Sequence, residues 1–442
     1  MRHSAILFRA AAILTVALLA LPMPAAAQSV RSELEALREQ VAQSQRDLQA
    51  ALERIQELEA KQAQTEEEIA AIPEPRVTPD RSNVRLEVSG RINQGVFFAD
   101  NGNDSKVFIA DNDNSGSRFG LRGEYDWNEW TSGVRLEATF EVNSTDEFSF
   151  TDSGPVGTSP ADGEDFLDVR HAHWYVNHPS YGEFSIGFSN TATEEVAEFD
   201  LHGTSCCVAQ SDVDDPAGGL EFSSSTPGFE LIPEVDDFFN NLDGERTSRI
   251  YYETPDLFVE GLNVQVSARQ DDRIRPDASI RYDGEFDSFE VGGGFGYRGE
   301  EDADVFVGSV GGKVAGFSLS FAGGVQSEDG GSTNDPRFFY VSGGYETNLL
   351  ENLVGGDIGE TRFVVDYFNG RNNDDFASPA GDLPKAQSFG GGVVQVIKPL
   401  GMEAYLGARY YDVQDLYDGD TGDRIADPDG LFVIWSGARV RF

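Results

Sequence analysis

The sequence has few of the residues that stabilise exported proteins through covalent links or bind nucleic acid. Cysteine occurs only twice, at the neighbours Cys206 and Cys207, so a framework of disulfides is excluded. A bridge between the two neighbours is disfavoured, because consecutive Cα atoms lie about 3.8 Å apart and disulfides usually join Cα atoms ~4.4–6.8 Å apart. Lysine occurs five times and the net charge is -44, which argues against nucleic acid or an anionic membrane surface as a partner. The charge alone is equally well explained by solubility or by a high-salt habitat.

The sequence also has little continuous apolar length. One apolar run spans about residues 10–21, preceded by Arg2 and Arg9 and followed by the small residues of 24–27. This order is typical of an export signal, and we expect residues 1–27 to be a signal peptide that is cut after Ala27. No later run approaches the ~18 apolar residues that a membrane-spanning helix requires. The mature chain is therefore expected to have no spanning helix.

Residues 28–75 carry the heptad pattern of a coiled coil. Pro73 and Pro75 end the pattern, and residues 76–83 form a short linker. A single amphipathic helix has nothing to cover its apolar seam, so the pattern implies partner chains. The two core positions of the heptad hold Leu34, Val41, Leu48, Ile55, Gln62 and Ile69, and Leu37, Ser44, Ala51, Leu58, Thr65 and Ile72.

From residue 84 to the end, apolar residues alternate with polar or small ones, which predicts strands. Leu86 and Val88, for example, alternate with Arg85 and Glu87. Charged residues on one face and aromatic residues near the segment ends favour a membrane barrel with a wet lumen over a soluble sandwich. The predicted strands are 84–98, 116–126, 131–142, 166–177, 182–190, 247–255, 261–270, 275–284, 287–298, 304–313, 315–326, 336–346, 358–368, 385–397, 400–411 and 431–442.

The number of segments and the lengths of their connections both favour closure. Sixteen is even, as in bacterial barrels, and short turns alternate with long connections such as 143–165 and 191–246. The stretch 347–357 is long where a short turn is expected, so eighteen strands stay an alternative. We expect an all-β transmembrane fold, in which a closed antiparallel β-barrel of 16 strands over 84–442 follows an α-helical coiled coil.

Three short motifs resemble trimeric Gram-negative porins. They are GSRFGLRG at 116–123, RHAHWYV at 170–176 followed by YGEFSIG at 181–187, and the terminal RVRF at 439–442. The coiled coil before the barrel is most similar to the DcaP-like porins. The resemblance implies a homotrimer in the outer membrane of a Gram-negative bacterium, with the coiled coil in the periplasm.

Residues 191–245 hold fourteen Asp or Glu and no Lys or Arg. Their apolar residues are too scattered for a core, so this long stretch needs walls to lean on. In sixteen-stranded porins the loop after the fifth strand narrows the channel, so the resemblance makes 191–246 the constriction loop, although the Pro-Glu-Phe-Gly-Gly signature of general porins is absent. The acids predicted at the constriction are Glu194, Glu195, Glu198, Asp200, Asp212, Asp214, Asp215, Glu230, Glu234, Asp236 and Asp237, and the wall residues predicted opposite them are Arg118, Arg122, Arg135, Arg170, Arg249, Arg269 and Arg281.

Acids opposite arginines produce a transverse field that acts on ions and dipolar solutes and weakens with salt. The alternative is that the acids are solvated and the arginines pair with wall carboxylates such as Glu137. By alternation, His171 and His173 are predicted on the outward face with Tyr175, where a trimer has its subunit interface.

No motif predicts a cofactor or a resident metal. Asp111 opens the first half of a calcium-binding loop, but Arg122 stands where that loop needs a bidentate Glu. Weak surface calcium binding by Asp418, Asp420 and Asp423 is the most that the sequence supports.

The expected function is passive diffusion of ions and small hydrophilic solutes through an outer-membrane porin, with a mild cation preference from the acidic loop. The arginine wall favours anionic solutes such as dicarboxylates as an alternative. A structural alternative is a barrel anchor that tethers the outer membrane to the cell wall, since the coiled coil would reach about 65 Å. A barrel lipase is a third alternative, and no catalytic spacing supports it.

Overall fold

The computed structural model describes residues 84–442, without 141–142, 151–166, 227–230, 271–272, 329–334, 357 and 419–420. The predicted signal peptide, coiled coil and linker lie outside the described residues. Among the residues described, none of the helices has the length and apolar character that crossing a membrane requires. The described chain is built mainly of long antiparallel strands.

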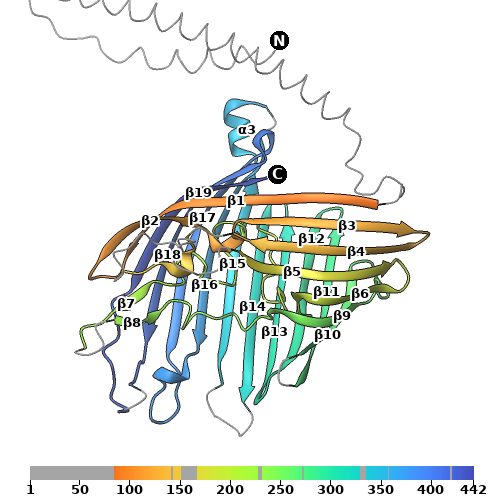
Figure 1. The fold of residues 1–442 in the computed structure, drawn as a ribbon. Coiled ribbons are helices and arrows are strands. Elements are labelled where there is room, and N and C mark those ends of the chain that lie inside the picture. Colours follow the sequence, from red (N-terminus) through yellow and green to blue (C-terminus); the bar gives the residue numbers. More distant parts are fainter. Residues whose placement is uncertain are drawn as a thin grey trace, which may run out of the picture. The chain divides into compact units, whose positions relative to one another are not determined.

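The strands form a closed sheet, because the first strand, β1 (Val84–Asp100), pairs antiparallel with the last, β19 (Leu431–Arg441). Successive strands lie side by side around the barrel (Figure 1), and the C-terminus lies at the same end as the short helix α3 (Leu349–Val354). The other strands of the barrel are β2 (Ser105–Asp111), β3 (Arg118–Trp127), β4 (Trp130–Thr139), β5 (Asp168–His178), β6 (Gly182–Asn190), β9 (Arg246–Glu253), β10 (Leu262–Gln270), β11 (Ile274–Phe286), β12 (Phe289–Gly299), β13 (Ala303–Val314), β14 (Phe317–Glu328), β15 (Arg337–Thr347), β16 (Thr361–Arg371), β17 (Lys385–Ile397) and β18 (Met402–Gln414).

The predicted count of sixteen strands is confirmed, and the alternative of eighteen is wrong. The sheet has 17 strands, but β2 and β3 share one position because both pair with β1. No strand is predicted between the segments 84–98 and 116–126, and this expectation is wrong because β2 lies there. In β2, Val107 and Ile109 are exposed while Phe108 and Ala110 are buried, which is strand alternation that the polar flanking residues obscured. The long turn at 347–357 contains α3.

Outward and inward side chains alternate as predicted along most strands. On β1, Val96 and Phe98 are exposed on the outer face, while Phe97 and Ala99 are buried inside. The outer face is therefore apolar, as the hydrocarbon region of a membrane requires.

The prediction that His171, His173 and Tyr175 face outward is wrong, and a β-bulge is the reason. Glu137 of β4 pairs with His171, but the next residue of β4, Ala138, pairs with Val169, so Arg170 is an extra residue in β5. Past this extra residue the alternation is reversed. The histidines and Tyr175 therefore point into the barrel, and Trp174 takes the outer face with 44% of its surface exposed.

The buried core of the barrel lies between its inner wall and the long connection 191–245. This connection contains the separate two-stranded sheet of β7 (Glu221–Ser223) and β8 (Leu231–Glu234), labelled in Figure 1. Ser223 Oγ donates to the carbonyl of Asn101, which follows β1, at 2.6 Å. Phe239 packs against Tyr411 and Phe368 of the wall, with ring centroids 5.2 and 5.6 Å away. The connection has no core of its own and shares one with the barrel, as its scattered apolar residues predict.

Candidate pore constriction

The connection 191–245, here called the lumen loop, is fastened to the inner wall by its own backbone carbonyls. Ser279 Oγ donates to the carbonyl of Ala192 at 2.6 Å, and Arg281 Nη2 donates to the carbonyl of Glu194 at 2.6 Å. Ser309 Oγ donates to the carbonyl of Val196. The first part of the loop is therefore held by β11 and β13, several strands away from β6, where the loop begins.

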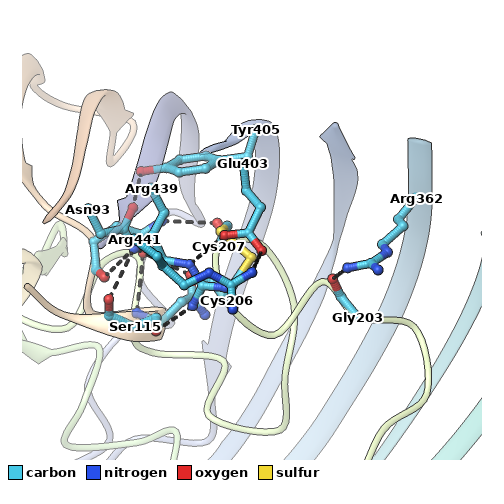
Figure 2. Close-up of a disulfide and its surroundings, with 12 residues drawn as sticks. Asn93, Ser115, Gly203, Cys206, Cys207, Arg362, Glu403, Tyr405, Arg439 and Arg441 are labelled. Atoms are coloured by element: carbon cyan, nitrogen blue, oxygen red, sulfur yellow. Dashed lines mark hydrogen bonds and ion pairs between the residues drawn. A yellow bond between two sulfur atoms is a disulfide. The ribbon is translucent and has the colours of Figure 1, made fainter. Parts of the chain in front are cut away.

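The middle of the lumen loop reaches the opposite wall. Arg362 Nη1 of β16 donates to the carbonyl of Gly203 at 3.0 Å. Asn93 of β1 and Trp435 of β19 donate to the carbonyls of Cys206 and Cys207 at 3.3 and 2.9 Å. Figure 2 shows both cysteines beside Asn93, where the first and last strands meet. The loop therefore crosses the lumen and contacts the barrel at its seam, where the first and last strands, β1 and β19, pair.

Cys206 and Cys207 form a disulfide, so the expectation that the two neighbours are not bridged is wrong. Their Cα atoms lie 3.7 Å apart, below the usual range, as expected for neighbours. The bridge lies in packed surroundings, since Cys206 is 7% exposed and Cys207 is completely buried. The wall bonds to both carbonyls hold this turn in place.

The inward face of β12–β19, here called the loop-covered wall, has glycines where the loop lies against it. A Cβ on Gly296 would lie 2.8 Å from Thr193 Cγ2, and a Cβ on Gly344 would lie 2.5 Å from His202 Nδ1. These distances are too short for a real side chain. The missing side chains therefore make room for the loop.

The inward face of β3–β6, here called the charged wall, carries ionised groups instead. Arg118 and Arg135 reach the carboxylate of Glu137 at 3.2 and 2.8 Å, and Arg170 lies 3.4 Å from the same carboxylate. One carboxylate thus shares three guanidinium groups. This cluster keeps a net positive charge, although the expected alternative of pairing with Glu137 also applies to each arginine.

A cavity of about 210 Å³ lies between the charged wall and the start of the lumen loop, and it is called the arginine cavity below. Arg249 is oriented there by the carbonyl of Asn190 and by Ser185 Oγ, each at 2.8 Å. His171 is held by Ser189 Oγ at 2.8 Å. The charged and imidazole groups that line this cavity are Arg135, Arg249, Arg281, His171, His173, Glu183, Glu194 and Glu195.

A second cavity of about 450 Å³, the acidic cavity, lies beside the first. Glu194 lines both cavities, and its carboxylate pairs with Arg246 at 2.7 Å. The ionisable groups of the acidic cavity are Asp168, Glu194, Glu198, Asp212, Asp243, Glu245, Arg170 and Arg246. Six carboxyl groups therefore face two guanidinium groups.

Burial weakens the charge of these loop carboxyls. It raises the pKa of Glu194 to about 7 and that of Asp243 to about 6. Burial also raises the pKa of Glu198 and of Asp212 well above the ordinary values, and the nearby charges of Asp212 for Glu198 and of Asp215 for Asp212 add to this rise in pKa. The acidic cavity therefore carries less negative charge at neutral pH than its composition suggests.

The structure places four of the predicted loop acids at the cavities, together with four of the predicted arginines. These are Glu194, Glu195, Glu198 and Asp212, and Arg135, Arg170, Arg249 and Arg281.

The other predicted acids lie elsewhere. Asp200 accepts from the backbone of His202 at 2.8 Å, and Asp215 accepts from Asn114 at 3.2 Å. Asp214 lies next to Asp215 in the loop and lines neither cavity. Glu234, Asp236 and Asp237 are exposed near β8, and Glu230 lies outside the described residues.

Three predicted arginines line neither cavity. Arg118 binds Glu137 as described, and Arg122 donates to Tyr175 at 2.8 Å. Arg269 pairs with Glu300 at 2.5 Å and also with Glu245, which lines the acidic cavity.

Asp243 and Glu245 belong to the acidic loop that was expected to face the wall, although they were not among the acids predicted at the constriction. Sequence reasoning missed Arg246, Asp168 and Glu183, and it missed the histidines because of the bulge. The position of Arg246 directly after the loop was a usable signal, whereas nothing in the sequence indicated the bulge.

Within the described residues, no three His, Cys, Asp or Glu side chains are grouped so that they could hold a metal ion. Asp420 lies outside these residues, and the expectation of weak calcium binding stays a prediction.

Comparison with known proteins gives a consistent result. The family model of Gram-negative porins matches residues 14–416. The anion-selective porin from Comamonas acidovorans is similar in structure, with a TM-score of 0.53 and 16% identity over 81% of this chain and 100% of that chain. OmpF of Salmonella typhi in complex with daunomycin has a TM-score of 0.52 and 14% identity over 81% of this chain and 97% of that chain. The outer membrane channel DcaP of Acinetobacter baumannii has a TM-score of 0.48 and 13% identity over 83% of this chain and 99% of that chain. No curated protein matches the sequence.

Proposed function

The chain belongs to the Gram-negative porins, and we propose that this outer-membrane channel passes ions and small hydrophilic solutes by passive diffusion with a mild preference for cations. The family match spans most of the chain, so the porin resemblance seen in the sequence is confirmed. Porins are channels and not enzymes, which excludes the lipase alternative.

The acidic cavity carries the proposal of cation preference. It is the larger of the two cavities beside the lumen loop, and its six carboxyl groups outnumber its two guanidinium groups. Raised pKa values remove part of this charge, and the exposed carboxyl groups of Asp168 and Glu245 complete the acidic lining. A cation entering this space meets a net negative potential, which is the physical origin of a mild preference.

The test is the reversal potential of purified channels in a planar bilayer under a salt gradient. We expect wild type to be cation-selective and the variant Asp168→Asn with Glu245→Gln to lose about two- to five-fold of the cation-to-anion permeability ratio, because a unit charge about 4 Å away in water contributes about 1 kcal/mol. The effect should shrink as salt rises.

A matched control removes the same number of charges away from both cavities. Glu234 and Asp236 belong to the same loop and are exposed near β8, so Glu234→Gln with Asp236→Asn should leave the permeability ratio unchanged. Anion selectivity of wild type, unaffected by either double variant, would overturn the cation preference.

The arginine cavity supports the second candidate, a pore that favours anionic solutes such as dicarboxylates. Arg135, Arg249 and Arg281 converge on it, and it is the smaller space, so it has the stronger influence on a solute that must pass it. This candidate predicts an anion-selective wild type whose selectivity falls in Arg249→Gln and survives Asp168→Asn with Glu245→Gln. The two candidates therefore differ in the sign of the reversal potential.

The homotrimer and the periplasmic coiled coil belong to the same proposal and rest on the heptads and on the resemblance. Removal of residues 28–75 should leave barrels that insert and conduct but separate into monomers more easily in detergent. Light scattering of the purified detergent complex measures this directly, and trimers of unchanged stability would count against a trimerising role for the heptads.

A further inference from the structure

We propose that the Cys206–Cys207 disulfide is a redox-controlled latch that holds the lumen loop at the barrel seam and thereby sets the width of the pore. When a small dithiol reduces it, the latch opens, the turn loosens and the pore widens. The inference rests on the channel function proposed above.

The turn that contains the disulfide is closed on itself. The backbone N–H groups of Cys207 and Val208 both donate to the carbonyl of Thr204 at 3.0 Å. The disulfide adds a covalent ring that runs through the peptide bond between the two cysteines, so neither residue can rotate freely. Opening the ring returns this torsional freedom to both residues.

Three different elements grip the ring from outside. Asn93 Nδ2 of β1 donates to the carbonyl of Cys206 at 3.3 Å. Asn112 Nδ2, directly before the 3-10 turn Asp113–Ser115, and Trp435 Nε1 of β19 donate to the carbonyl of Cys207 at 3.0 and 2.9 Å. Asn93 is itself oriented by the hydroxyl of Tyr405, which donates to its Oδ1 at 2.9 Å (Figure 2). These wall donors can be satisfied only if the carbonyls of Cys206 and Cys207 keep their orientation, and the disulfide ring restricts their rotation.

The turn is connected to the acidic cavity by a short stretch of loop. Val208 lies against Gly392, where an added Cβ would be 2.8 Å from Val208 Cγ1, and Tyr411 donates to the carbonyl of Val213 at 2.6 Å. Between these two points, Ser211 Oγ donates to the carbonyl of Ala197 at 3.0 Å, and Asp212 lines the cavity. Movement of the cysteine turn therefore changes the position of a group that faces the solute.

The chemical step is a thiol–disulfide exchange with a small dithiol. Its thiolate attacks Sγ of Cys206, which is 7% exposed, whereas Cys207 is buried. The S–S bond breaks, Cys207 leaves as a thiolate and takes a proton, and a mixed disulfide forms at Cys206. The second thiol of the reductant then displaces Cys206, which also takes a proton. Two electrons pass to the cysteines, and the dithiol becomes a cyclic disulfide.

The experiment compares three preparations of the full-length protein by single-channel recording. They are wild type refolded without reductant, wild type refolded with excess dithiothreitol so that burial does not limit access, and Cys206→Ser with Cys207→Ser. Mass shifts after alkylation establish the thiol state, and heat-dependent gel mobility establishes that each barrel is folded.

We expect the reduced wild type and the double serine variant to show a mean conductance about 1.5-fold higher than the oxidised protein and a noisier open current, because conductance follows the free cross-section of the pore. Oxidation of the reduced wild type should restore the lower conductance, and the serine variant should not respond to dithiothreitol.

Equal conductance and noise in all three preparations would overturn the latch. Two alkylatable thiols in protein purified without reductant would overturn it as well. Absence of channels in every preparation would instead contradict the proposed function, so the two failures are distinguishable.

Discussion

The two walls of the lumen differ in what their inward residues do. On the loop-covered wall, glycines such as Gly296, Gly344 and Gly392 leave space that loop side chains fill. On the charged wall, Arg118 and Arg135 both pair with Glu137, and Arg135 also lines the arginine cavity. The same barrel interior is therefore a packed core on one side and a wet, ionised surface on the other.

This difference shows that the lumen loop does more than place acidic groups in the pore. Its backbone carbonyls are used for anchoring, its apolar residues pack against the glycine side, and only a few of its acids reach the cavities. The selectivity of the pore then depends on the few groups at the boundary between the walls, with Glu194 in contact with both cavities.

The largest effect is expected from the ion pair that the loop covers. Arg409 binds both carboxylate oxygens of Asp366 at 2.7 and 2.8 Å, and both side chains are almost completely buried. Asp366→Ala leaves a buried guanidinium unpaired and should cost about 3–5 kcal/mol of unfolding free energy. Denaturant titration in detergent, followed by gel mobility, measures this cost.

Arg85 of β1, whose partner Glu124 belongs to the charged wall, provides the contrasting case. It pairs with Glu124 at 2.6 Å, but 61% of its side chain is exposed. Because exposed pairs are screened by water and salt, Arg85→Ala should not change the unfolding transition measurably. Equal losses in both variants would show that the loop does not seal its wall from water.

A smaller effect is expected from two neighbouring glycines. Gly344→Ala would place a Cβ 2.5 Å from His202 Nδ1 and 2.9 Å from Ser318 Oγ, whereas the nearest atom to a Cβ on Gly343 is 4.0 Å away. Overpacking of this kind costs about 1–3 kcal/mol, so Gly344→Ala should destabilise the barrel and disturb the loop. Gly343→Ala is the matched control and should behave like wild type in the same titration and in single-channel recordings. A harmless Gly344→Ala would contradict the close packing of the loop on its wall.

The smallest effect is expected from pH. Carboxyls are charged above their pKa, and burial raises the pKa of Glu194 to about 7 and that of Asp243 to about 6. Cation preference should therefore fall as pH drops from about 8 to about 5, well above the ordinary carboxyl pKa of about 4, while the arginines keep their charge. Reversal potentials across this range measure the change. Glu194→Gln should remove the part near pH 7, and a wild-type selectivity that is constant down to about pH 4 would contradict the raised pKa values.

The strands could be predicted from the sequence because apolar residues alternate with charged ones along each segment. A membrane barrel with apolar residues facing lipid and charged residues facing the lumen is the simplest explanation of this pattern. β6 and β17 have the predicted bounds, and the strands missed in the described part of the chain are β2 and the short pair β7 and β8. The bulge at Arg170 could not be predicted, since alternation counted residue by residue carries no sign of an inserted position.

The site was less predictable than the fold. The loop's acids were visible in the sequence, but their separation into cavity-lining and remote groups depends on how the loop packs in three dimensions. The inward glycines that determine this packing, such as Gly296, look like weak strand formers in the sequence. The disulfide was judged from chain geometry alone, without the wall donors Asn93 and Trp435 that hold its turn.

The bulge in β5 has an evolutionary consequence. Because side chains alternate with a period of two, one inserted residue absorbed as a bulge exchanges the lipid-facing and water-facing sets along the rest of that strand. Here the bulge at Arg170 places an imidazole pair and a tyrosine on the lumen face and Trp174 on the lipid face. A pore of this fold can thus acquire a new lining through a single-codon insertion or deletion, without any substitution of the residues that become exposed to the solute.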